Sequence, residues 1–255
     1  MMNNQLIIPT AEPFLFTAGK TGCVLVHGFT GAPKEMRLMG EALQSQGISV
    51  LGVRLAGHAT QPDDLNRTLW RDWLASVEDG IHILSDICDT VFIAGLSLGG
   101  ILSLVAASRY PQLKGAIAIA TPYNLGEDWR LKFARPLSGI FPRINKKGDE
   151  TRDLTTAREH IDYPAYPTRG IAELQDLTKV LHHSLPMIKI PVLLINSRTD
   201  HTVPLWHADK IQQEITSSEA ERLIIEESGH VITEDIGRER VFEVAFQFIK
   251  KHGGK

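Results

Sequence analysis

The sequence contains only two cysteines, Cys23 and Cys88, among 255 residues. Two cysteines do not argue for a disulfide-stabilised secreted protein, so we expect two buried thiols and no disulfide. No apolar run approaches the roughly 18 residues that a membrane-spanning helix requires. The N-terminal segment lacks the basic region and the apolar core of a signal peptide. We therefore predict a soluble, cytoplasmic protein without stable membrane insertion.

The chain also lacks an excess of basic charge. The formal net charge is −3 at pH 7, and the Lys and Arg residues are dispersed, so the chain lacks the basic surface typical of nucleic-acid binding. His182 and His183 form a pair without a third partner at metal-ligand spacing. Gly28 and Gly31 have the wrong spacing for a phosphate-binding loop. We expect no metal, no cofactor and no nucleic-acid partner, and the sequence leaves the oligomeric state open.

Strand and helix patterns alternate along the chain. Continuous apolar runs predict strands that are buried on both faces, as in parallel sheets. These runs are 23–27, 48–53, 91–95, 115–120, 191–196 and 222–226. Between 69 and 88, apolar residues recur on one face of a predicted helix. The alternation predicts a single α/β domain with a mostly parallel, doubly wound sheet.

One interval is longer than the others. Some 70 residues separate the strand that ends near Ala120 from the strand that begins near Val192, whereas a simple crossover needs about a dozen. We interpret 124–190 as a small helical cap inserted into a core formed by 1–123 and 191–255. The alternative is an ordinary excursion that packs away from the site. In a cap, one apolar face would line an acyl pocket: Trp129, Phe133, Leu137 and Phe141.

Residues 95–99 read Gly-Leu-Ser-Leu-Gly, between a predicted strand and a predicted helix. At such a corner, G-x-S-x-G holds its serine on a sharp, strained turn. Gly95 and Gly99 supply the small residues needed where strand and helix nearly touch. We predict that Ser97 is presented as a nucleophile at the carboxyl end of the sheet.

Two further residues follow predicted strands in the order that this corner requires. Asp200 comes after the run 191–196, and His230 comes after the run 222–226. The order Ser, Asp, His is that of the α/β-hydrolases, and one end of one sheet would carry all three. We predict that His230 is the base and that Asp200 orients it. The backbone N–H of Leu98, at a helix N-terminus, is a predicted oxyanion donor.

Other residues compete for these roles. A serine or aspartate in a loop is usually a cap or turn residue, and only the ordered set of three favours catalysis. Glu234 and Asp235 lie close to the predicted base and are alternative acids. His201 is a weaker alternative base, because it is expected to point to the opposite side. We assign His27 and His58 to structure, since neither follows the last strand.

Four motifs resemble one known family, the bacterial carboxylesterases and monoacylglycerol lipases of the α/β-hydrolase superfamily. They are H-G-F-T-G at 27–31, R-L-A-G-H at 54–58, G-L-S-L-G-G at 95–100 and S-G-H-V-I-T at 228–233. The resemblance runs from about residue 10 to the C-terminus and is weakest at 124–165. It implies an α/β-hydrolase fold and a second oxyanion donor, the backbone N–H of Phe29. The glycerol-contacting residues of the family are not assigned to this chain.

Together these features predict a serine carboxylic-ester hydrolase that acts through an acyl-enzyme on short- to medium-chain esters, a carboxylesterase. Monoacylglycerol lipase is the alternative within this class. Amide or carbon–carbon bond hydrolysis is also compatible with the three residues. The alternative outside the enzymes is a non-catalytic binding module on the same fold.

Overall fold

The computed structural model describes residues 6–126, 134–146, 153 and 159–254. Seven strands form one sheet in the order β1-β3-β2-β4-β5-β8-β9. They are β1 (Phe14–Phe16), β2 (Thr21–Val26), β3 (Ser49–Val53), β4 (Thr90–Leu96), β5 (Ala116–Ile119), β8 (Val192–Ser197) and β9 (Ala220–Ile225). The six predicted strands match β2, β3, β4, β5, β8 and β9, which pair in parallel. The predicted mostly parallel sheet is therefore confirmed.

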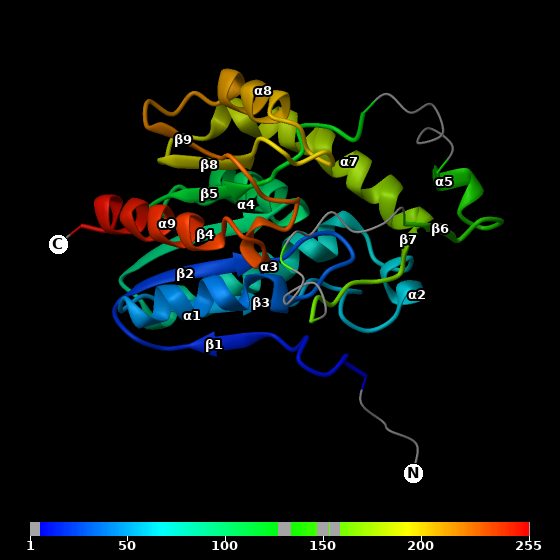
Figure 1. Cartoon of the computed structure of the whole chain (residues 1–255), viewed down its shortest axis with the longest axis horizontal. Coiled ribbons are helices and arrows are strands. Elements are labelled where there is room, and N and C mark those ends of the chain that lie inside the picture. The colour runs from blue at the N-terminus through cyan, green and yellow to red at the C-terminus, as the bar shows by residue number, and fades with distance from the viewer. Residues whose placement is uncertain (1–5, 127–133, 147–152, 154–158, 255) are drawn as a thin grey trace, which may run out of the picture.

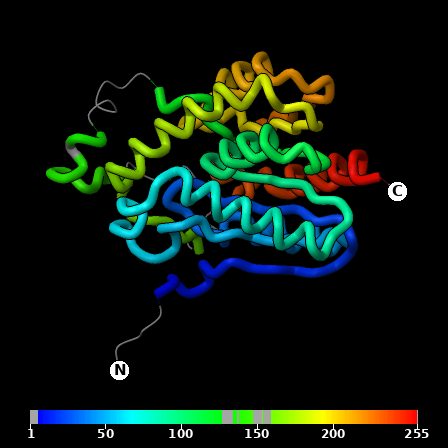
Figure 2. The backbone as a smooth tube through the Cα atoms, turned by 180° about the vertical axis from the view of Figure 1, so that it is seen from behind, coloured from blue at the N-terminus to red at the C-terminus, as the bar shows by residue number. Residues whose placement is uncertain are grey.

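The sheet lies between two layers of helices. On one face are α1 (Arg37–Ser45) and α9 (Arg238–His252), and on the other are α3 (Trp70–Ile87), α4 (Leu98–Arg109) and α7 (Thr168–Ser184) (Figures 1 and 2). The shorter helices are α2 (Pro62–Leu65), α5 (Ala134–Leu137) and α8 (Trp206–Glu214), with 3-10 turns η1 (Pro33–Met36), η3 (Leu185–Met187) and η4 (Ile232–Glu234).

Alternate side chains of each central strand enter separate cores. In β2, Val24 and Val26 pack in the core beneath α3, α4 and α7, while Cys23 and Leu25 pack in the core beneath α1 and α9. Because successive side chains point to opposite faces of a sheet, a strand covered on both sides must be apolar throughout. The continuous apolar runs of the sequence follow from this. Cys23 and Cys88 are both free and buried.

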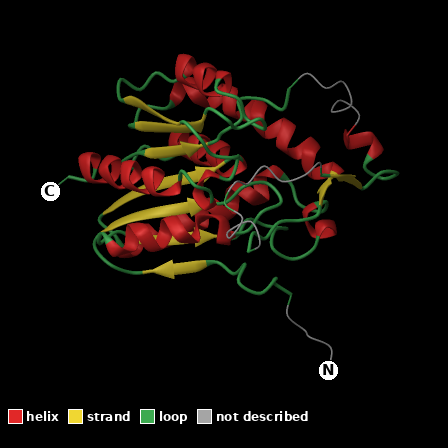
Figure 3. Cartoon of the chain, in the orientation of Figure 1, coloured by secondary structure: helices red, strands yellow, loops and turns green. Residues whose placement is uncertain are grey.

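The predicted insertion 124–190 contains elements of two kinds. Its first part includes α5 and the antiparallel pair of β6 (Arg143–Asn145) and β7 (Ala165–Pro167), which lie beyond the carboxyl ends of the parallel strands (Figure 3). Its second part is mainly α7, which packs against α4 and places Leu177 and Leu181 in the core. The boundaries of the insertion remain a prediction.

Within the described ranges, no helix is long and apolar enough to cross a membrane.

Candidate active site

Ser97 lies at the corner between β4 and α4. Its backbone has φ 54° and ψ −113°, a left-handed conformation that costs a residue with a side chain about 1–3 kcal/mol. The neighbouring strand keeps Ser97 in this strained conformation, because the Ser97 N–H donates a hydrogen bond to the Ile119 carbonyl at 2.8 Å. The serine side chain lines a cavity at the carboxyl end of the sheet.

The glycines of the motif are required by close backbone contacts. A Cβ atom on Gly95 would lie 2.1 Å from the Gly99 carbonyl oxygen, and one on Gly99 would lie 2.1 Å from the Val26 carbonyl oxygen. Neither backbone oxygen can move without displacing strand β2 or helix α4. The helix can therefore start directly behind the serine only with glycine at both positions.

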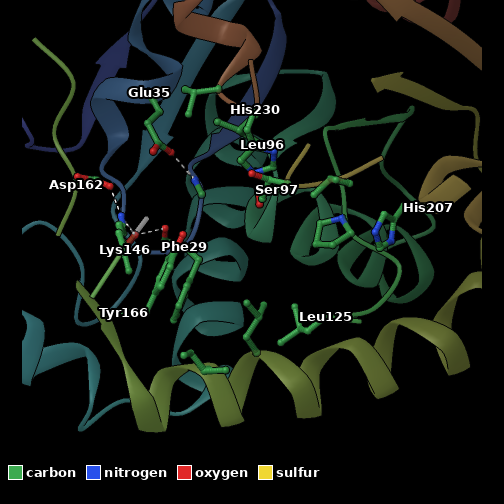
Figure 4. Close-up of a pocket in the computed structure, with 18 of the residues that line it drawn as sticks. Phe29, Glu35, Leu96, Ser97, Leu125, Lys146, Asp162, Tyr166, His207 and His230 are labelled. Atoms are coloured by element: carbon green, nitrogen blue, oxygen red, sulfur yellow. Dashed lines mark hydrogen bonds and ion pairs between the residues drawn. The ribbon is translucent and has the colours of Figure 1, made fainter. Parts of the chain in front are cut away.

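Asp200 and His230 meet across the ends of β8 and β9. The Nδ1 atom of His230 lies 2.8 Å from Oδ2 of Asp200. The other carboxylate oxygen, Oδ1, accepts hydrogen bonds from the backbone N–H groups of Thr202 and Val203, both at 2.8 Å. Contacts at both oxygens therefore hold the carboxylate in place, and Asp200 is only 3% exposed. His230 and Ser97 line the same cavity (Figure 4).

The alternative acids and bases have other surroundings. Asp235 accepts hydrogen bonds from the Gly229 N–H and from the Ser228 hydroxyl, and so shapes the loop that carries His230. Oε2 of Glu234 lies 2.7 Å from Nδ1 of His160. The structure thus pairs His230 with Asp200 rather than with either neighbour. His201, the alternative base, is exposed to solvent.

His27 and His58 are fully buried beneath the site. Nε2 of His27 accepts a hydrogen bond from the Leu55 N–H at 3.2 Å, which links the 27–31 and 54–58 motifs. Burial lowers the pKa of His27 to about 4 and lowers that of His58 well below its usual value. Both imidazoles are therefore neutral in the neutral pH range.

The two predicted oxyanion donors lie on different elements. Leu98 is the first residue of α4, where backbone N–H groups have no helical partner. Phe29 is in the loop between β2 and η1, and it lines the cavity together with Ser97. The Phe29 ring stacks on the Tyr166 ring, with centroids 6.2 Å apart and planes 9° apart. The loop and the β7 strand therefore share one wall of the cavity.

The cavity has a volume of about 750 Å³ and two chemically different ends. The apolar side chains of the lining include those of Leu125, Ile171, Leu174 and Val203, which we call the apolar end, and His207 lies on the same side of Ser97 as Leu125. The other end carries charged side chains: Glu35, Lys146, His160 and Asp162. In Figure 4 the labelled charged residues Glu35, Lys146 and Asp162 lie to one side of Ser97, and Leu125 lies to the other.

The apolar face of the predicted cap contributes little to the described lining of this cavity. Trp129 and Phe133 lie outside the described residues, as does the side chain of Leu137. Phe141 is 60% exposed and lies outside the cavity lining, so its predicted place in an acyl pocket is wrong. Apolar residues of α7, Ile171 and Leu174, line the cavity instead.

The charged end is a network that sequence reasoning missed. Lys146 pairs with Asp162 and donates a hydrogen bond to the Thr30 hydroxyl at 2.8 Å. Burial raises the pKa of Glu35 to about 7, against the lowering effect of His160. Burial would lower the pKa of His160, but its hydrogen bond to Glu234 and the nearby carboxylates raise it to about 9. No sequence motif links these residues, which come from distant parts of the chain.

His207 was also missed. Its Nδ1 accepts a hydrogen bond from the Tyr123 N–H at 3.0 Å, and it lines the cavity. Burial lowers the pKa of His207 to about 4, with a contribution from His230 and against the effect of Asp200. It is therefore a neutral neighbour of the Asp200–His230 pair.

Within the described segments, no group of three or more His, Cys, Asp or Glu residues is arranged to hold a metal ion.

Comparison with known proteins places this arrangement in a family. The family model described as Serine aminopeptidase, S33 matches residues 18–237. The chain belongs to this family. Among curated proteins, it is 34% identical to the thermostable monoacylglycerol lipase of Bacillus sp. (strain H-257), over all of both chains. It is 29% identical to the carboxylesterase of Bacillus subtilis (strain 168), over 96% of this chain and 98% of the esterase.

Solved structures share the fold. A structure from work on LipS and LipT, two metagenome-derived lipolytic enzymes, has a TM-score of 0.91 and 32% identity, and covers 96% of this chain and 100% of its own. The monoacylglycerol lipase of Paleococcus ferrophilus shares the fold, with a TM-score of 0.81 at 18% identity over 94% of this chain and 98% of its own. The predicted family resemblance, the α/β-hydrolase fold and the assignment as a serine hydrolase are confirmed.

Proposed function

We propose that this serine hydrolase cleaves carboxylic esters through an acyl-enzyme, with Ser97 as nucleophile, His230 as base and Asp200 as its orienting acid. The observation that carries the proposal is the Asp200–His230 contact of 2.8 Å beside the strained Ser97 turn. His230 would take the Ser97 proton and later return it to the leaving alcohol. Asp200 would hold the imidazole in one tautomer and stabilise the imidazolium.

The developing oxyanion needs donors that are already in place. We assign this role to the backbone N–H groups of Leu98 and Phe29. The first has the positive end of the α4 dipole behind it. The second lies on the loop that the β7 wall covers. Removal of one such donor typically costs about 10²- to 10³-fold in kcat, so the position of the Phe29 loop matters greatly for the rate.

The two ends of the cavity suggest how an ester is oriented. The apolar end, with Leu125, Ile171 and Leu174, suits an alkyl chain, and each buried methylene contributes about 0.8 kcal/mol. Specificity should therefore rise with acyl length until this end is full. We propose short- to medium-chain acyl groups, as in a carboxylesterase. The charged end offers hydrogen-bond partners for a polar alcohol, and this observation favours monoacylglycerols as the second candidate substrate.

A panel of substrates tests these proposals. We expect hydrolysis of p-nitrophenyl esters from acetate to palmitate to peak at an intermediate length. Comparison of 1-monobutyrin with ethyl butyrate decides between the candidates, because only the first carries free hydroxyls for the charged end. Matching p-nitroanilides test amide hydrolysis. Turnover of amides but not esters would refute the proposal, and absence of any turnover would favour a binding module.

A further inference from the structure

The carboxylate of Glu35 fills the inside of the loop that carries Phe29. Its Oε2 accepts the Gly28 N–H at 2.6 Å. A Cβ atom on Gly31 would lie only 2.0 Å from Oε1, so the loop is wrapped closely around the carboxylate. Glu35 is 4% exposed and comes from η1, which directly follows the loop. The path of the loop is therefore set by Glu35 as well as by strand β2.

His160 joins this carboxylate to the 3-10 turn η4. Its Nε2 lies 3.9 Å from Oε1 of Glu35, and its Nδ1 lies 2.7 Å from Oε2 of Glu234. Glu234 belongs to η4, which follows the loop of the proposed base. The segment after His160 also holds the Phe29 loop through its backbone, because the Tyr163 N–H donates to the Thr30 carbonyl at 3.0 Å.

We propose that Glu35 is a positioning residue for the oxyanion donor on Phe29, and that His160 holds Glu35 in place. This inference rests on the ester hydrolase function proposed above. The Glu35 carboxylate fixes the peptide between His27 and Gly28, and thereby restricts the direction of the next peptide, which carries the Phe29 N–H. Oxyanion donors act through their position before the reaction begins. A displaced donor therefore lowers the rate of the chemical step and leaves substrate binding largely unchanged.

The charges around Glu35 support this role. The groups that face it are His160, Glu234 and Asp162. An ionised acceptor binds an N–H group about twice as strongly as a neutral one, but a bare negative charge near the oxyanion would oppose the reaction. The raised pKa of His160, about 9, keeps that imidazole cationic at neutral pH. The cation lowers the pKa of Glu35 against the effect of burial, and so favours the ionised carboxylate that accepts the Gly28 N–H.

Four variants test the proposal: Glu35→Ala, Glu35→Gln, His160→Gln and the control Glu159→Gln. Glu159 is adjacent to His160, but its side chain is 73% exposed and pairs with Lys34 at the surface. Active sites are counted by titration with a chromogenic phosphonate ester, so that kcat refers to folded enzyme only. On a p-nitrophenyl ester, which has no free hydroxyl for the charged end, we expect Glu35→Ala to lower kcat about 10- to 10²-fold, part of the cost of losing a donor, with KM nearly unchanged.

Glu35→Gln keeps an acceptor oxygen for the Gly28 N–H and should recover most of the lost kcat. His160→Gln should give a smaller loss, again in kcat. An alkyl trifluoromethyl ketone, which forms a tetrahedral oxyanion on the serine, should lose affinity in parallel with kcat. The control Glu159→Gln should match the wild type in kcat, in KM and in affinity for the ketone.

A purely structural role would give a different pattern. The proposal is overturned if kcat per titrated site is unchanged in Glu35→Ala and His160→Gln, or if only KM rises. If Glu35→Ala does not fold, His160→Gln still decides, through its kcat and its affinity for the ketone. Failure of the wild type to hydrolyse any ester would refute the proposed function, whereas an active wild type with unaffected variants would refute only the role of Glu35.

Discussion

Replacement of His160 by glutamine should remove a pH-dependent part of the stability. The pKa of His160 is raised from 6.5 to about 9 in the folded protein. A raised histidine pKa stabilises the fold fully below pH 6.5, and this contribution is lost as the pH rises through 9. At about 1.4 kcal/mol per pKa unit, the rise corresponds to about 3 kcal/mol. The His160 side chain is only 12% exposed, so solvent screens the interaction weakly.

Urea unfolding of the wild type, His160→Gln and the Glu159→Gln control across this range measures the contribution. Glu35 also has a raised pKa, about 7, and its own contribution is lost between pH 4.5 and 7. Because His160 lowers the pKa of Glu35, the difference between wild type and His160→Gln reports these two coupled groups together. We expect the free energies of unfolding of wild type and His160→Gln to converge as the pH rises to 9 and beyond. A difference that stays constant, or that grows with pH, would refute the ion-pair network.

Two further predictions concern the proposed site. Asp200→Asn should keep the fold and lose activity by about 10⁴-fold, as loss of tautomer control does in other triads; near wild-type rates in the ester assay would place the acid elsewhere. Leu174→Ala should shift the acyl-length optimum toward longer chains, because Leu174 lines the apolar end of the cavity. Leu177→Ala is the matched control, because Leu177 is a fully buried core residue of the same helix. This substitution should cost about 2–5 kcal/mol of stability and leave the acyl-length optimum unchanged. Equal shifts in both variants would contradict the assignment of the pocket.

The parallel strands were predictable because both of their faces are covered, which makes each one a continuous apolar run. Strand β1 was not, because Phe14–Phe16 is three residues long and pairs antiparallel at the sheet edge. Such a segment shows too little alternation to be distinguished from a loop. Strand β6, which pairs antiparallel with β7, is exposed at all three residues. Its sequence therefore shows no pattern of buried and exposed residues from which a strand could be predicted.

The positions of Ser97, Asp200 and His230 were predictable because each directly follows a strand, and the strands bring them to one edge of the sheet. The charged end of the cavity depends instead on contacts between residues that are far apart in the sequence. Glu35 and His160 are 125 positions apart by their numbers, and neither belongs to a pattern that pairs it with the other. The close fit of Gly31 to Glu35 becomes visible only when the loop is folded around the carboxylate.

Ser97 should carry the acyl group during turnover. Mass spectrometry of the protein, quenched with acid during hydrolysis of a slowly deacylated p-nitrophenyl ester, tests it most directly. We predict the mass of one acyl group on the peptide that contains Ser97, and no adduct in Ser97→Ala, whose activity should fall by about 10⁴-fold or more. An acyl group on another residue, or a folded Ser97→Ala variant that keeps a tenth of the wild-type rate, would contradict the account.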